Sequence, residues 1–167
     1  MASFADFSRA GMAVVLAAAV LVSACARTPN SEPGGLGVGA AAGAATPGSA
    51  QDFIVNVGDR VFFDTDSVVL TPQSRQTLDR QAQWLNQYPR YTITVEGHAD
   101  ERGTREYNIA LGSRRAQAVQ GYLVSRGVGS NRLRIISYGK ERPVAVCDDI
   151  SCWSQNRRAV TAVQGVQ

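Results

Sequence analysis

The sequence has a single histidine, His98, and only three cysteines among its 167 residues. No second histidine or cysteine stands near His98 at the spacing of a zinc site, and no Gly-x-Ser-x-Gly segment marks a serine hydrolase. These absences argue against a metal centre and against nucleophilic catalysis, and we expect no cofactor. His98 is interpreted as a hydrogen-bonding residue at the end of a strand.

Charge is also sparse, because charged residues make up 19% of the chain and the formal net charge is +3. Nucleic-acid-binding proteins cluster their basic residues, whereas here basic and acidic residues are intermixed. We therefore expect no nucleic-acid partner. Hydrophobic residues reach 44%, which is enough for a folded core.

No apolar run is long enough to span a membrane, which takes about 20 residues. The most apolar segment runs from Ala10 to Val22 and follows Arg9, the one basic side chain of the N-terminal segment. A short apolar run after a basic residue is typical of a cleaved export signal. The sequence therefore predicts a signal segment over residues 1–24.

Val22-Ser23-Ala24-Cys25 resembles a bacterial lipobox, in which the cysteine thiol carries a diacylglycerol after cleavage. Ordinary signal cleavage without lipid is the alternative. Each buried methylene contributes about 0.8 kcal/mol, so two or more acyl chains anchor a protein firmly. Among such lipoproteins an aspartate after the cysteine often signals inner-membrane retention. Ala26 stands there instead, which implies a lipid anchor in the outer membrane with the domain facing the periplasm.

Residues 26–50 are mostly Gly, Ala, Ser and Pro, with no aromatic residue and no apolar period. This composition predicts a flexible linker behind the lipidated Cys25, so that residues 25–50 form a tether. A linker of this size averages roughly 25–30 Å from end to end and stretches to roughly 80–90 Å. It would let a domain of residues 51–167 reach a polymer near the membrane.

The domain's apolar pattern alternates between strand and helix periods. It predicts an α/β sandwich in the order strand, helix, strand, helix, strand, strand, with helices on one side of the sheet. Residues Ile54–Val57 are a short first strand or a lead-in. The expected strands are Arg60–Phe63, Tyr91–Glu96, Leu133–Ser137 and Arg158–Val163. The expected helices start at the cap Thr71 and end before Pro89, and run from about Arg105 to Ser125.

Two aspartates, Asp64 and Asp100, each follow a predicted strand directly. If those strands are parallel, both carboxylates lie at the sheet edge where open α/β sheets bind ligands. The helix after Gly103 points free N–H groups to the same edge, which favours an anion. Arg115 lies on the apolar face of that helix and can extend its guanidinium to the edge. It either meets a ligand there or forms an ion pair with Asp64 or Asp100.

The segments GHADERGTREYN and LGSRRA, between Thr94 and Ala116, resemble the signature of OmpA-like peptidoglycan-binding domains. Details such as ERGTREYN and LGSRRA are similar to the peptidoglycan-associated lipoprotein subgroup, and the resemblance extends from about Gly58 to Val163. It implies a βαβαββ sandwich with a mixed sheet of about four strands and helices packed on one face.

The resemblance implies that Asp100 and Arg115 bind diaminopimelate of the peptidoglycan stem peptide. The ligand's free end carries an ammonium, which can donate hydrogen bonds to Asp100, and a carboxylate, which an arginine fork can bind through two hydrogen bonds. Backbone N–H groups of Gly103 and Thr104 can also reach the carboxylate. We therefore predict that Asp100→Ala or Arg115→Ala abolishes sacculus binding while the chain stays folded.

Other positions match the family around this site. Asp64 is a wall residue or a turn cap, and Leu111 is a ligand neighbour or a core residue. Asn108 is expected beside the ligand. One arginine of the NRR motif at 156–158 reaches the site; we assign Arg158, although adjacent strand residues face opposite ways and Arg157 stays open.

Cys147 and Cys152 are close in the sequence, and in an oxidising compartment a disulfide between them is the default. So short a loop contributes roughly 2 kcal/mol of stabilisation. Because similar sequences often lack these cysteines, the disulfide is expected to be a local staple before the last strand.

The resemblance implies an outer-membrane lipoprotein that binds the cell wall and works with TolB and other Tol components in envelope integrity and constriction at division. One alternative is an OmpA-like wall-binding module with another envelope task, such as spacing or motor anchoring. A periplasmic enzyme that uses Asp64 and Asp100 as a carboxylate pair is less favoured, because nothing in the sequence indicates a raised pKa.

Overall fold

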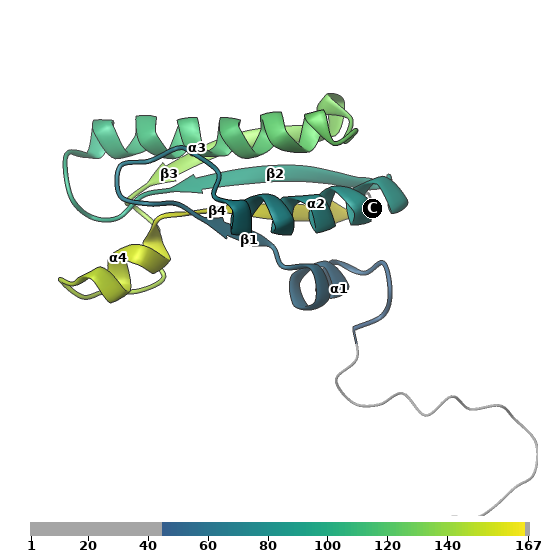
Figure 1. Ribbon diagram of the computed structural model, residues 1–167, viewed down its shortest axis with the longest axis horizontal. Helices are drawn as coiled ribbons and strands as arrows, with labels where there is room; N and C mark the ends of the chain where they lie inside the picture. Colours follow the sequence, from purple (N-terminus) through teal and green to yellow (C-terminus); the bar gives the residue numbers. More distant parts are fainter. Residues whose placement is uncertain (1–44, 166–167) are drawn as a thin grey trace, which may run out of the picture. The chain divides into compact units, whose positions relative to one another are not determined.

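The computed structural model describes residues 45–165, which form a layered α/β domain (Figure 1). The predicted signal segment, the lipidation site Cys25 and the linker up to residue 44 lie outside the described residues. Residues ahead of position 51 also contact the domain, because the carbonyl of Gly48 accepts hydrogen bonds from Arg90 and Tyr91.

The domain is built on one mixed sheet of four strands in the order β1-β4-β2-β3. β4 lies between β1 and β2 and is antiparallel to both, while β2 and β3 are parallel. β1 and β2 therefore run in the same direction, and the segments after them leave the sheet at the same end. The bounds are β1 Arg60–Phe62, β2 Tyr91–His98, β3 Leu133–Gly139 and β4 Arg158–Gly165.

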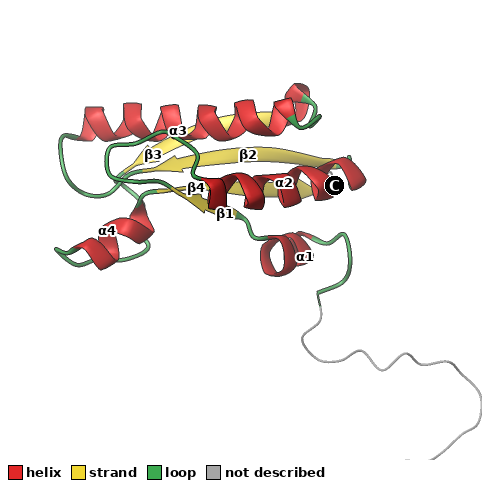
Figure 2. Cartoon of the chain, viewed as in Figure 1, coloured by secondary structure: helices red, strands yellow, loops and turns green. Residues whose placement is uncertain are grey.

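Two long helices cover one face of this sheet, as predicted (Figure 2). They are α2, Pro72–Gln87, and α3, Arg105–Ser125. Thr71 caps α2 by accepting a hydrogen bond from the Ser74 N–H, and Thr104 caps α3 in the same way through Tyr107. The shorter elements are α1 Ala50–Asp52, the π-helix η1 Phe53–Val57, the 3₁₀-helix η2 Ser130–Arg132 and α4 Ile150–Asn156.

The core lies between these helices and the sheet. Tyr91, Ile93 and Val95 of β2 are buried, as the alternating pattern predicts. α3 sits unusually close to β2, because a Cβ on Gly97 would lie 1.8 Å from the carbonyl oxygen of Gly112. These two glycines allow the close contact that fixes the depth of α3 beside the sheet edge.

Two local elements differ from the sequence-based expectation. Residues Ile54–Val57, expected as a short strand or a lead-in, belong to η1 and not to a strand, because Ser49 caps α1 and Phe53 is completely buried, in contact with Trp84. The packing of Phe53 outweighs the strand preference of its β-branched neighbours. α4 was not predicted; it begins inside the loop closed by the Cys147–Cys152 disulfide and ends just before β4.

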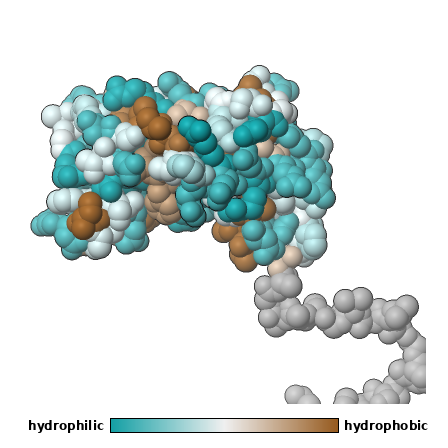
Figure 3. Space-filling model, viewed as in Figure 1, coloured by the Kyte–Doolittle hydropathy of each residue, from teal (hydrophilic) through white to brown (hydrophobic). Residues whose placement is uncertain are grey.

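The face of the domain seen in Figure 3 is mainly polar, and hydrophobic residues form small separate groups on it. Across residues 45–165, no helix combines the length and apolar character needed to cross a membrane.

Candidate functional site

The predicted sheet edge contains a hollow of about 220 Å³ between the segment that follows β1 and the start of α3. It lies beyond the carboxyl ends of β1 and β2, where open α/β sheets commonly bind ligands. Its walls combine a carboxylate pair, two arginines and a tyrosine with small and apolar groups. The lining residues are Thr65, Asp66, Asp100, Arg102, Gly103, Tyr107, Asn108, Leu111 and Arg115.

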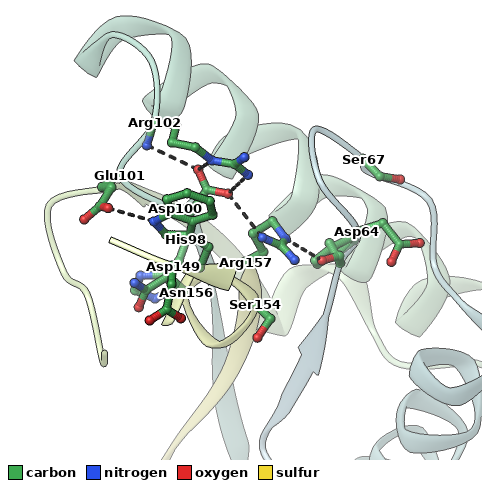
Figure 4. A network of polar contacts seen from close by, with 12 residues as sticks. Asp64, Ser67, His98, Asp100, Glu101, Arg102, Asp149, Ser154, Asn156 and Arg157 are labelled. Atoms are coloured by element: carbon green, nitrogen blue, oxygen red, sulfur yellow. Dashed lines mark hydrogen bonds and ion pairs between the residues drawn. The ribbon is translucent and has the colours of Figure 1, made fainter. Parts of the chain in front are cut away.

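Asp100 is the carboxylate at the base of this hollow, and it is only 7% exposed. Arg102 donates to both of its oxygens, with Nη2–Oδ2 at 2.7 Å and Nε–Oδ1 at 3.3 Å, and Arg157 Nη1 lies 3.4 Å from Oδ2 (Figure 4). Burial by itself raises the pKa of Asp100. The hydrogen bonds and charge of Arg102, helped by Arg157, outweigh burial and lower the pKa below 3.8. Asp100 is therefore a negative charge at neutral pH.

Arg115 is fully buried, and its guanidinium donates to three backbone carbonyls. Nε contacts the Ser67 oxygen at 2.9 Å, Nη1 the His98 oxygen at 2.8 Å and Nη2 the Asp64 oxygen at 3.1 Å. Burial lowers the pKa of Arg115 to about 10, although the negative charge of Asp100 acts in the opposite direction. Arg115 thus ties the segment after β1 to the end of β2 while it remains charged.

The ion-pair alternative for Arg115 is wrong, whereas the ligand contact is not tested by this arrangement. Within residues 45–165, no carboxylate lies within ion-pair distance of its guanidinium. Within the described residues, three of its five N–H groups are bonded to carbonyls, so the contact of Arg115 with a ligand carboxylate stays a prediction. The expectation that Arg115→Ala stays folded is revised, because the substitution would leave three carbonyls without their donor.

The remaining predicted residues divide into those that line the hollow and those that do not. Gly103, Asn108 and Leu111 line it, and Thr104 caps the helix that forms its wall. Asn108 Nδ2 donates to the carbonyls of Arg102 and Thr104 at 2.7 and 3.1 Å, which shapes the turn after Asp100. Asp64 lines a neighbouring hollow of about 480 Å³ instead.

The choice of Arg158 as the site arginine was wrong in geometry, because Arg157 is the one that faces Asp100. Arg157 also donates to the Phe63 carbonyl at 3.2 Å. Arg158 is directed to the other side of β4, where its Nη2 lies 3.4 Å from His98 Nδ1 and 3.2 Å from the Arg142 carbonyl oxygen. The alternation of side chains along a strand separates the two.

Sequence reasoning missed four residues of the hollow, which are Thr65, Asp66, Arg102 and Tyr107. Arg102 could have been identified from the sequence, because it is a charged residue two positions after Asp100 within the family segment. Tyr107 lies one turn before Leu111 on the same helix face, and its hydroxyl donates to Asp66. Asp66 adopts a φ of 54°, and no local pattern marks it as a partner of Tyr107.

Cys147 and Cys152 form the predicted disulfide, with their Cα atoms 5.7 Å apart. The bridge closes the segment that enters α4. Asn156, at the end of α4, accepts from the N–H groups of Val144 and Ala145 and donates to the Ala145 carbonyl. The segment is therefore held at both ends.

Comparison with known proteins places this geometry in a family. Residues 62–157 match the OmpA family. The chain is 65% identical over 152 residues to the peptidoglycan-associated lipoprotein of Rhizobium meliloti (strain 1021), covering 91% of this chain and 86% of that protein. It is 62% identical over 167 residues to the protein of the same name from Mesorhizobium japonicum, with 99% and 98% of the two chains covered.

Solved structures agree with the sequence comparison. The crystal structure of the peptidoglycan-associated lipoprotein from Burkholderia pseudomallei is similar with a TM-score of 0.65 and 40% identity, over 70% of this chain and 100% of that one. The C-terminal domain of Helicobacter pylori MotB has a TM-score of 0.61 at 25% identity, over 65% and 85% of the two chains. The sheet, the hollow at its edge and these matches together show that the chain belongs to the OmpA family, within the peptidoglycan-associated lipoproteins.

Proposed function

We propose that the chain binds peptidoglycan non-covalently by holding the free ammonium–carboxylate end of diaminopimelate in the hollow beside Asp100. The observation that carries this proposal is a buried, deprotonated carboxylate at the base of a hollow whose other charged walls include two guanidinium groups. An ammonium fits against Asp100, and a carboxylate fits toward the arginines and the N-terminus of α3. The relatives are named peptidoglycan-associated lipoproteins, which supports peptidoglycan as the polymer that carries the ligand.

The proposal includes an anchor and partners that rest on resemblance. An acylated Cys25 would fix the protein in the outer membrane, and the segment before residue 51 would let the domain reach the wall. TolB and other Tol components are the proposed partners in envelope integrity and in outer-membrane constriction at division. Co-purification of TolB with the tagged chain distinguishes this role from that of a wall-binding module with another envelope task.

The central test is co-sedimentation of the full-length protein with purified sacculi, competed by free meso-diaminopimelate. Asp100→Asn keeps the side-chain shape and removes the charge, so we expect binding to fall by more than about tenfold. Asp79→Asn is the matched control, because Asp79 also pairs with an arginine, Arg126 at 2.9 Å, but on the outer surface of α2. Equal sedimentation of the Asp100 variant and the wild type would contradict the proposal.

A further inference from the structure

Arg102 is held between the site carboxylate and an aromatic ring from a distant part of the chain. Its guanidinium pairs with Asp100, and its Cζ lies 4.3 Å from the centroid of the Trp153 ring. The Trp153 indole N–H donates to Glu101 Oε1 at 2.7 Å. Glu101 and Arg102, the two residues that follow Asp100, thus both contact one half-buried tryptophan on α4.

The position of Trp153 is fixed by contacts within its own segment of the chain. Asp149 caps α4, because its carboxylate accepts from the Ser151 N–H at 2.7 Å, and Cys152, next to Trp153, is bridged to Cys147. At the other end, Asn156 is buried and bonded to the segment before the bridge. Trp153 is therefore presented by a short closed segment, and this fixes where a stacked guanidinium can lie.

The two arginines that line the hollow differ in their freedom. Arg115 is fully buried and bonded to three carbonyls, whereas the side chain of Arg102 is 42% exposed. The side-chain partners of Arg102 are one carboxylate and one ring face. A carboxylate can be exchanged for another anion while the ring contact remains. Arg102 is the lining guanidinium that can change its ion-pair partner.

We propose that Trp153 is a positioning residue that makes the site selective for a ligand carrying an ammonium and a carboxylate on one carbon. This inference rests on the proposed function. In the free site, Trp153 holds Arg102 over Asp100. The incoming ammonium takes the place of Arg102 at Asp100, and the incoming carboxylate pairs with the displaced guanidinium, which stays on the ring. Two opposite charges enter together, so neither Asp100 nor Arg102 is left without a partner.

A ligand with only one of the two charges lacks this compensation. A simple amine must separate Arg102 from Asp100 and leaves the guanidinium without an anion at the edge of the hollow. A simple carboxylate draws Arg102 away and leaves Asp100 less well paired. Selectivity for the zwitterion therefore depends on how firmly Trp153 keeps Arg102 beside the hollow.

The test compares the affinity of the full-length protein for meso-diaminopimelate with its affinity for 1,5-diaminopentane, which has the same two amines and no carboxylate. The wild type is expected to prefer meso-diaminopimelate. In Trp153→Leu the ratio of the two affinities should fall about tenfold, because the stack is lost and the guanidinium is no longer held where the ligand carboxylate arrives. Trp153→Phe keeps a ring face and should retain most of the preference.

Two further variants separate positioning from folding. Arg102→Lys keeps the charge without a planar group to stack, and it should lose the preference as Trp153→Leu does. Tyr122→Leu removes another arginine–aromatic contact, Arg126 at 5.0 Å on α3, and should leave the ratio unchanged. An unchanged ratio in both Trp153→Leu and Arg102→Lys overturns the inference while sacculus binding still stands. If the wild type binds neither sacculi nor meso-diaminopimelate, the proposed function fails and this inference fails with it.

Discussion

At the end of the sheet where β2 begins, aromatic rings pack around Trp84, whereas at the end where β2 stops the buried groups are charged. Phe53, Tyr88 and Tyr91 lie 4.9, 4.7 and 5.2 Å from Trp84 by ring centroid. At the opposite end, Asp100 and the guanidinium groups of Arg115 and Arg157 are almost fully buried. One sheet thus joins an apolar end and an ionic end.

The two ends are stabilised by different physical terms. The aromatic end gains from the removal of apolar area from water and from ring contacts. The ionic end bears the desolvation cost of its charges and recovers it through hydrogen bonds to carbonyls and between side chains. Under the proposed function, the aromatic end holds the domain together and the ionic end recognises the charged ligand.

The largest expected effect is on stability, at the aromatic end. Phe53→Ala removes a completely buried ring and should lower the free energy of unfolding by about 3–5 kcal/mol. Urea denaturation followed by circular dichroism measures it. Ile54→Ala, at a neighbouring side chain that is 46% exposed, should change stability by no more than about 0.5 kcal/mol. The protein that remains folded should bind sacculi as the wild type does; weakened binding would show that the two ends are coupled.

Arg115→Met should affect stability and binding together. Methionine fills much of the volume, but the carbonyls of Asp64, Ser67 and His98 lose their donor, and we expect a loss of about 3–4 kcal/mol. Arg114→Met, at the exposed neighbouring arginine, is the matched control for removing a positive charge from α3. If Arg115→Met binds poorly but unfolds at the wild-type urea concentration, Arg115 contributes to the ligand and not to the fold.

Local signals explain how much of the fold could be predicted. The caps Thr71 and Thr104 and the apolar period define α2 and α3, because capping and periodicity are properties of neighbouring residues. The strand alternation that begins at Tyr91 places Asp100 at the end of β2 for the same reason. η1 and α4 could not be predicted in this way, because a buried Phe53 and a disulfide-closed segment stabilise them through distant contacts.

Only those parts of the site that follow from neighbouring residues in the sequence could be predicted. Asp100 and the wall formed by α3 follow from strand and helix ends. The three carbonyl acceptors of Arg115 belong to segments that only the folded chain brings together. The choice between Arg157 and Arg158 depends on how β4 is paired with β1, where Phe62 faces Arg158 across the ladder. Register between distant strands leaves no signal in a single sequence.

The smallest expected effect is a pH dependence at the ionic end, and it arises from His98. The ring is 2% exposed, Arg158 Nη2 lies 3.4 Å from Nδ1, and Glu96 Oε2 lies 3.9 Å from Nε2. The Tyr138 ring packs 5.5 Å away by centroid, and Arg142 Cζ lies 3.6 Å from the centroid of that ring. Burial, followed by the charges of Arg158 and Arg142, lowers the pKa of His98 from 6.5 to about 4.

The sign of this effect follows from which state takes up the proton first. As the pH falls through 6.5 the unfolded chain protonates its histidine, while the folded chain keeps His98 neutral until about pH 4. The free energy of unfolding should therefore be constant above pH 7 and fall between pH 6.5 and about 4, by at most about 3 kcal/mol.

Asp100 affects stability at lower pH, because its lowered pKa gives stability that is lost only as the pH falls below 3.8. Urea midpoints measured at half-unit steps should show the first slope in the wild type and not in His98→Gln, with the loss below pH 3.8 present in both. Equal slopes of the urea midpoint between pH 6.5 and 4 in the two proteins would contradict this prediction. They would mean that folded His98 takes up its proton in the same pH range as the unfolded chain and adds a positive charge beside Glu96.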